Sequence, residues 1–163
     1  YKGLPVKASR LFAGMEHEEQ VKRIAEHFNV PSGFYKNIDY DAKIVAKLPK
    51  LIVNDFAEAD LSVYSTIEEV YHAFIVHIMR KQVASTNLVL QSAKVKRIFV
   101  DGGFSKNPIY MNLLANAYPN MEVFAATVSQ ATALGAALAM HDAWNSKTVP
   151  SDIIGLKYFN KTV

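Results

Sequence analysis

The second half of the chain alternates between short apolar segments typical of strands and longer segments typical of helices. From residue 96 the order is KRIFVD, PIYMNLLANAY, MEVFA and QATALGAALAMHDAW. Because strands that alternate with helices tend to pair in parallel under those helices, this order predicts an α/β layer architecture. Residues 98–100 are all apolar, so we expect their strand to be buried on both faces.

Two segments of the first half carry apolar residues at helical spacing. The first runs from about residue 16 to residue 29 and ends before Pro31, which indicates an amphipathic helix. The second runs from residue 65 to about residue 93, and Ser65 with Glu68 predicts a capping box at its start. Residues 1–12 resemble a hairpin, residues 31–60 give mixed signals, and the tail after Trp144 reads as an irregular edge.

Composition and charge exclude several classes of protein. With 163 residues, of which 50% are hydrophobic, the chain suits one domain. Its 18 basic and 15 acidic residues are scattered, which argues against a nucleic-acid partner. The apolar stretches fall short of the roughly 20 residues of a membrane helix. The lack of cysteine excludes disulfides and fits a reducing compartment, so we expect a cytoplasmic protein.

Two histidines of the long predicted helix do not form a metal-binding pair. His72 and His77 are five residues apart, which places them roughly 140° apart around a helix. Metal-binding histidines on one helix need a spacing that brings both rings to the same face. We therefore predict no metal ligand in this chain.

A sharp turn follows the strand of residues 98–100. Asp101, Gly102 and Gly103 would lie at the carboxyl end of that strand, where ligands of open α/β sheets bind. Glycines leave the backbone open to a ligand, and the following helix offers amide donors to anions. The alternative is that the glycines only permit a tight turn and that Asn107 only caps the helix starting at Pro108. The segment matches neither G-x-x-x-x-G-K-[ST] nor G-x-G-x-x-G.

A second feature is a cluster of small residues at positions 131–139, ATALGAALA. On a helix these residues make a face almost free of side chains, which allows close approach to a sheet or a ligand. We expect this helix to pack against the strand of residues 98–100.

The segments VDGGFSKNPIYMNLLA and QATALGAALA resemble the carboxyl-terminal domain of the FGGY carbohydrate kinases. This family belongs with actin and the heat-shock chaperone ATPases to a superfamily of ribonuclease H-like folds. The resemblance implies that residues 1–163 form the carboxyl-terminal, nucleotide-binding lobe of a two-domain sugar kinase. It also implies a ribonuclease H-like α/β fold that is incomplete at its amino-terminal strands.

The resemblance also assigns roles to residues of the turn. Gly102, Gly103 and Phe104 would pass close to the adenosine and nearer phosphates of ATP, and Asn107 would reach the adenine region. Asp101 is expected to hydrogen-bond the turn, and Lys106 to point to solvent. Gln130 stands where many members of the family carry an acidic residue, so no role is assigned to it.

The family's chemistry is ATP-dependent phosphorylation of a sugar hydroxyl, with magnesium. By resemblance, the amino-terminal domain supplies most of the sugar site, the magnesium contacts and the catalytic base, so we assign no catalytic residue here. The implied partners are ATP or ADP and a ketose or related polyol. The oligomeric state stays open between a monomer and a homo-oligomer. This chain alone is expected to be inactive.

Two other functions remain open at this point. One is a nucleotide-sensing or chaperone-like ATPase lobe of the same fold, without sugar chemistry. The other is a structural or interaction domain in which Gly102 and Gly103 serve packing only.

Overall fold

The fold described here comes from a computed structural model, which describes residues 7–48, 55–91, 94–126, 131–149 and 155–160. It is an α/β structure with a sheet of three strands, as the alternating pattern predicts. The α-helices are α1 (Gly14–Phe28), α2 (Ala42–Lys47), α3 (Ile67–Leu90), α4 (Pro108–Ala117), α5 (Ala131–Ala139) and α6 (His141–Trp144). The strands are β1 (Arg97–Val100), β2 (Glu122–Ala126) and β3 (Leu156–Phe159), and the short 3-10 helices are η1 (Phe34–Asn37), η2 (Phe56–Glu58), η3 (Leu61–Val63) and η4 (Gly103–Lys106).

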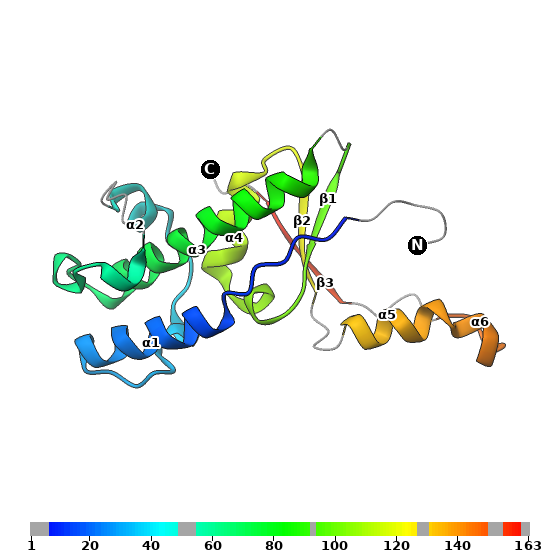
Figure 1. Cartoon of the computed structure of the whole chain (residues 1–163), viewed down its shortest axis with the longest axis horizontal. Helices are drawn as coiled ribbons and strands as arrows, with labels where there is room; N and C mark the ends of the chain where they lie inside the picture. Colours follow the sequence, from blue (N-terminus) through cyan, green and yellow to red (C-terminus); the bar gives the residue numbers. More distant parts are fainter. Residues whose placement is uncertain (1–6, 49–54, 92–93, 127–130, 150–154, 161–163) are drawn as a thin grey trace.

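The sheet has the order β1-β2-β3, with β1 and β2 parallel and β2 and β3 antiparallel. The register sets Phe99 opposite Phe124, and Phe124 opposite Tyr158. α4 packs against β2 and β3 and also against α3, and α1 and α2 pack against α3. Figure 1 shows α3 running past α4, with the sheet beyond it. α4 therefore covers one face of the sheet, and α3 packs against α4.

The two long helices of the first half form where their periodicity places them, but the cap of α3 lies one residue later than predicted. Its cap is Thr66, whose hydroxyl accepts a hydrogen bond from the Glu69 N–H at 3.2 Å. The Glu69 carboxylate in turn accepts from the Ser65 N–H at 2.8 Å. The prediction of Ser65 and Glu68 as the capping box was therefore wrong. The sequence Ser-Thr-Ile-Glu-Glu permits both registers, and the chain adopts the second.

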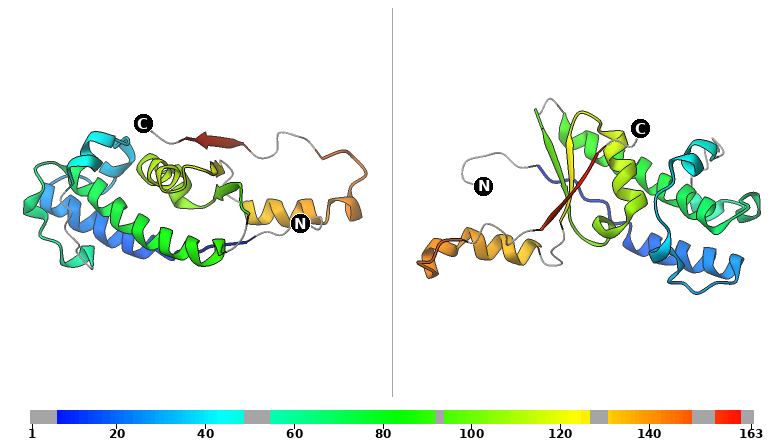
Figure 2. Two further views of the ribbon diagram at one scale, coloured as in Figure 1. Left: turned by 90° about the horizontal axis from the view of Figure 1, so that it is seen from above. Right: turned by 180° about the vertical axis from the view of Figure 1, so that it is seen from behind.

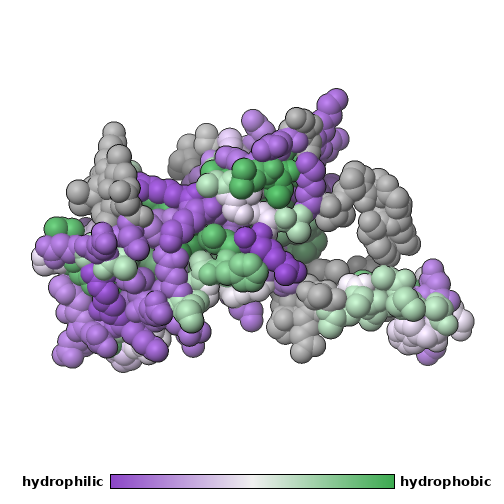
Figure 3. Space-filling model, viewed as in Figure 1, coloured by the Kyte–Doolittle hydropathy of each residue, from purple (hydrophilic) through white to green (hydrophobic). Residues whose placement is uncertain are grey.

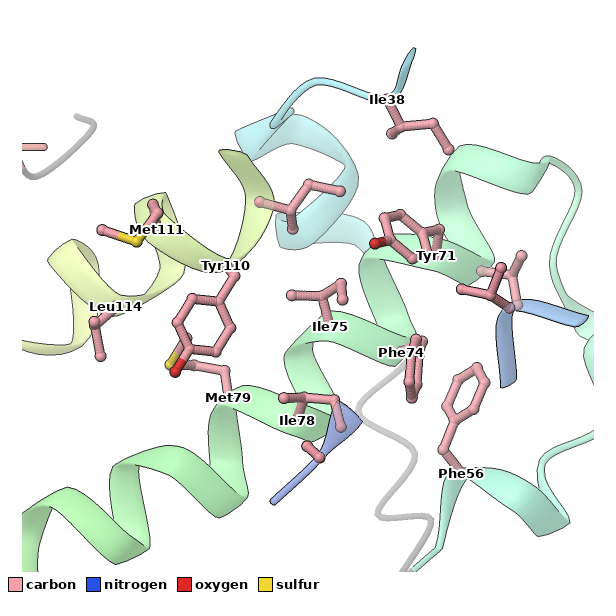
Figure 4. Close-up of a cluster of buried hydrophobic side chains, with 14 of the residues drawn as sticks. Ile38, Phe56, Tyr71, Phe74, Ile75, Ile78, Met79, Tyr110, Met111 and Leu114 are labelled. Atoms are coloured by element: carbon pink, nitrogen blue, oxygen red, sulfur yellow. The ribbon is translucent and has the colours of Figure 1, made fainter. Parts of the chain in front are cut away.

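The core is built around α3, which packs against both α4 and α1 (Figure 4). Side chains from α3 fill its centre, and Tyr110 of α4 points toward Met79 of α3, while Met111 and Leu114 of α4 are also buried. The buried residues of α3 are Val70, Tyr71, His72, Phe74, Ile75, His77, Ile78, Met79 and Thr86. All but Thr86 lie between Val70 and Met79, so this part of α3 is enclosed by other elements on more than one side.

β1 is buried on one face only, so the prediction of a strand buried on both faces was wrong. Ile98 and Val100 pack against the core, whereas 58% of Phe99 is exposed. Phe99 stacks on Phe124 with ring centroids 5.3 Å apart, and Tyr158 lies 5.3 Å from Phe124 on the other side. The outer face of the sheet is therefore a row of aromatic side chains that no described helix covers. Continuous apolarity in the sequence could not distinguish this arrangement from full burial.

Four other predictions need correction. The expected helix from residue 130 to Trp144 is divided at Met140 into α5 and α6. α5 does not pack on β1, but extends from the body in Figures 1 and 2 and forms a pale green arm in Figure 3. The tail forms β3 instead of an irregular edge. Of the predicted hairpin, residues 7–13 form no strand, and residues 1–6 lie outside the described residues.

Among the described residues, no helix has both the length and the apolar character needed to cross a membrane.

Replacing Phe74 of α3 by alanine tests the importance of this core. Phe74 is fully buried, and its ring lies 5.0 Å from that of Phe56. We expect Phe74→Ala to lower the free energy of unfolding by about 3–5 kcal/mol, because it leaves a cavity. Leu88 is the matched control on the same helix because 69% of it is exposed, so Leu88→Ala should change the value by less than about 0.5 kcal/mol. Urea unfolding measures both, and equal effects would contradict the assignment of the core.

Candidate functional site

The turn between β1 and α4 lies where the carboxyl ends of the two parallel strands meet. Ser105, buried in η4, links the ends: its hydroxyl oxygen is 2.8 Å from the Gly102 carbonyl oxygen and 3.2 Å from that of Ala126. The single hydroxyl proton can be donated to only one carbonyl at a time. Because Ala126 is the last residue of β2, this contact fixes the turn to the neighbouring strand.

Gly102 has a backbone conformation that requires glycine. Its φ is 86° and its ψ is −163°, a region that residues with a Cβ rarely enter. The Asp101 carboxylate accepts a hydrogen bond from the Gly102 N–H at 2.7 Å. The prediction that Asp101 hydrogen-bonds the turn is therefore confirmed. Gly102 is explained by the shape of the turn alone.

Gly103 is different, because the turn does not require glycine at this position. Its φ is not positive, and a Cβ built on it meets no described atom within 4 Å. The residue is exposed, so the missing side chain leaves bare backbone facing solvent. An exposed glycine without a conformational reason is what a site that admits a ligand against the backbone would show.

Phe104 and Lys106 take opposite directions from the turn. Phe104 is half-buried, stacks on Tyr110 at 4.8 Å between ring centroids, and meets the His17 ring edge-on at 5.5 Å. Lys106 is exposed, as predicted. The Phe104 ring therefore anchors the turn to α4 and α1. Its backbone carbonyl accepts from the Asn107 N–H at 3.1 Å, which ties the turn to the start of α4.

Asn107 uses both ends of its side-chain amide within the fold. Its oxygen accepts from the Tyr110 N–H at 3.1 Å, which makes it the predicted cap of α4. Its nitrogen donates to the Tyr71 hydroxyl at 2.8 Å. The predicted contact between Asn107 and adenine stays a prediction. The structure shows that the side chain is oriented by α4 on one side and by α3 on the other.

A chain of hydrogen-bonded side chains runs from this asparagine through the buried Tyr71 to α1. The Tyr71 hydroxyl lies 3.0 Å from His17 Nε2. Because the hydroxyl already accepts from Asn107, its own proton is free to be donated to His17 Nε2, which requires a neutral imidazole. Burial lowers the pKa of His17, and the negative charge of nearby Glu18 opposes this shift. Burial raises the pKa of Tyr71. Both shifts keep the chain neutral near pH 7.

Sequence reasoning missed His17 and Tyr71. Tyr71 lies within the apolar stripe of the helix predicted from residue 65 to about residue 93, and His17 lies 54 residues away from it. A tyrosine within an apolar stripe does signal a hydroxyl that needs a partner. The partner itself cannot be read from the chain, because it depends on how α1 packs on α3.

The small-residue helix is not brought to the turn. Most described residues of α5, including Gly135, are exposed. α5 extends away from the sheet in Figures 1 and 2. Gln130 lies outside the described residues. Two surface cavities lie elsewhere: His72 lines one of about 480 Å³, and Lys22 lines one of about 510 Å³. Neither cavity is lined by a residue of the turn.

One comparison with known proteins gives a match. Residues 52–144, more than half of the chain, match the model of the FGGY family of carbohydrate kinases, C-terminal domain. The matched range contains α3, β1, the turn, α4, β2 and α5. No curated protein and no solved structure matches the chain.

The two glycines of the turn should differ when each is replaced by alanine. Gly102→Ala forces a side chain into a conformation it disfavours, so we expect the free energy of unfolding to fall by about 1–3 kcal/mol. Gly103→Ala meets no described atom and should change it by less than about 0.5 kcal/mol. Chemical denaturation of the pair provides the measurement. Equal losses for both would show that Gly103 is also required by the fold.

The lowered pKa of His17 predicts a pH dependence of stability. Below about pH 6.5 the unfolded chain binds a proton at His17 more readily than the folded chain does. The free energy of unfolding should therefore fall as pH falls from about 7 to about 5, with His17 contributing at most about 1.4 kcal/mol per pH unit. Burial also lowers the pKa of His72, although its hydrogen bond to the Glu68 carbonyl opposes this shift. His72 therefore adds a second contribution to the pH dependence.

Denaturation curves across this pH range test the His17 contribution. His17→Gln retains an acceptor for the Tyr71 hydroxyl but cannot titrate, so its stability should depend less on pH than that of the wild type. His27 is exposed on the same helix, and His27→Gln should preserve the wild-type slope. A His17→Gln profile parallel to that of the wild type would contradict the prediction.

Proposed function

This chain belongs to the FGGY family of carbohydrate kinases, and on that premise we propose that it holds the adenosine end of ATP in a protein that phosphorylates a sugar hydroxyl. The acceptor would be a ketose or a related polyol. The chain would act as the carboxyl-terminal, nucleotide-binding lobe of a two-domain kinase with a ribonuclease H-like fold. A second lobe would supply most of the sugar site and the catalytic base.

The single observation that carries this proposal is the exposed backbone at Gly103. The turn lies at the carboxyl ends of parallel β1 and β2, the edge where α/β sheets bind ligands. Gly102 accounts for the shape of the turn, so Gly103 is left without a structural reason. The adenosine and nearer phosphates of ATP would lie against Gly102, Gly103 and the backbone of Phe104.

Asn107 would contribute to this site at the adenine end. Its orientation is set before any ligand arrives, because Tyr71 and the Tyr110 N–H hold its amide. A site whose groups are fixed in advance does not lose conformational entropy when the nucleotide binds. His17 and Tyr71 would therefore act as positioning residues, since they act on the turn through Asn107 and Phe104.

Phosphoryl transfer needs positive charge and magnesium around the transferred group. The Asp101 carboxylate near the turn accepts from Gly102, and we assign no magnesium ligand to the described residues. The magnesium contacts would come from the second lobe. We accordingly expect weak nucleotide binding and no sugar-dependent ATP consumption by the 163-residue chain alone. A cytoplasmic location, which the absence of cysteine favours, is part of the same proposal.

A titration of the isotopically labelled chain with ADP, and with ATP plus magnesium, tests the proposal. Backbone amide shifts followed to millimolar nucleotide should concentrate at residues 102–107. Gly103→Asp should weaken binding at least about tenfold, because its carboxylate would face the phosphates of the ligand. Gly33 is the matched control, because it is also exposed and a Cβ there meets no described atom. Gly33→Asp should therefore leave the affinity unchanged.

The outcomes separate the proposed function from its alternatives. No shift at the turn at any nucleotide concentration would contradict adenosine binding and favour a structural role for the glycines. Shifts that Gly103→Asp does not weaken would place the nucleotide elsewhere. Binding in a longer form of the protein that consumes ATP without any sugar dependence would favour a non-sugar ATPase of the same fold.

A further inference from the structure

Three potential metal ligands meet far from the turn, between α1 and α3. Glu16, Asp55 and His77 each offer a ligand atom, and these atoms all lie within 4.8 Å of one another. Glu16 is in the first turn of α1, Asp55 precedes η2, and His77 lies in the middle of α3. The fold therefore brings one imidazole and two carboxylates together from three separate segments.

Two of the ligand atoms already have the spacing of a metal site. His77 Nε2 is 3.1 Å from the Glu16 carboxylate oxygen Oε1. Around a tetrahedral zinc ion with bonds of about 2.0–2.1 Å, neighbouring ligand atoms are about 3.3 Å apart. The His77 side chain is buried, and its ring lies 6.2 Å from that of Phe56. A metal ion would thus take the place of the hydrogen bond between His77 and Glu16.

Asp55 is oriented by a hydrogen bond of its own. One of its carboxylate oxygens accepts from the Ala57 N–H at 3.0 Å, as the cap of η2. The carboxylate keeps a second oxygen for a metal ion, and the residue is exposed, which gives an ion a path from solvent. The site therefore has one buried ligand, His77, and one exposed ligand, Asp55.

Lys81 is the group that opposes a metal ion here. Its ammonium nitrogen is 2.8 Å from the same Glu16 oxygen that His77 contacts. The Lys81 side chain is 41% exposed, and its flexible stem allows the ammonium to move into water. Two carboxylates and a neutral imidazole balance the charge of a divalent ion completely. Once the Lys81 ammonium has moved into water, the ion and its three ligands together would carry no net charge.

We propose that Glu16, Asp55 and His77 form a zinc site. One imidazole nitrogen with two carboxylate oxygens is a ligand set that zinc accepts, with water in the fourth position. Magnesium and calcium prefer oxygen ligands alone, so the buried His77 nitrogen argues against them. The ion would join α1, α3 and the residue that precedes η2. This site is independent of the proposed nucleotide turn.

Calorimetric titration of the full 163-residue chain with zinc chloride tests the site, with cobalt(II) absorption as a second probe of coordination. We expect one equivalent to bind. His77→Gln and Asp55→Asn should each weaken binding at least about tenfold, as the loss of a metal-site partner does. Asp60 is the matched control for Asp55, because it is an exposed aspartate that caps η3 in the same way. Asp60→Asn should bind zinc as the wild type does.

Lys81→Met distinguishes the metal site from a simple ion-pair cluster. Removing the competing ammonium should strengthen zinc binding severalfold, whereas Lys22→Met, at an exposed lysine of α1, should not. Saturating zinc should also raise the melting temperature of the wild type, and this rise should disappear in Asp55→Asn. Circular dichroism verifies that each variant is folded. The proposal is wrong if neither the wild type nor Lys81→Met binds zinc, or if His77→Gln binds it equally well.

Discussion

The buried hydroxyl of Tyr71 is the constraint on which the arrangement of the candidate site depends. A polar group inside a core destabilises the fold unless it is hydrogen-bonded. Tyr71 is fully buried, and its hydroxyl contacts Asn107 at the start of α4 and His17 of α1. Satisfying this one group therefore fixes α1, α3 and the β1–α4 turn relative to one another.

This constraint gives Asn107 a structural role beside the role that the family resemblance implies. Its amide oxygen caps α4 while its nitrogen meets Tyr71, so the residue would contribute to a nucleotide site from a fixed position. Gly103 is the complementary case, since the fold makes no demand on it. The turn thus combines one residue held by the core with one residue that the core leaves free.

Exposed apolar surface is the other general feature of the structure. Phe99, Leu156 and Tyr158 are about half exposed on the outer face of the sheet, and α5 stands apart from the body (Figures 1 and 3). Apolar surface of this kind is typical of regions that contact further protein. It fits our proposal that the chain works as one lobe of a larger enzyme. In such an enzyme, other elements would cover the outer face.

The sequence by itself determined the features that depend on neighbouring residues. The positions of α1 and α3, the Asn107 cap before Pro108 and the glycine turn all follow from local patterns, and the order of strands and helices predicts the parallel pairing of β1 and β2. Only the tertiary structure decided that Phe99 is exposed and that Tyr71 meets His17. It also brought Glu16 to His77, 61 residues further along the chain. The physical reason is that burial and hydrogen-bond partners are set by segments distant in sequence, which no local periodicity encodes.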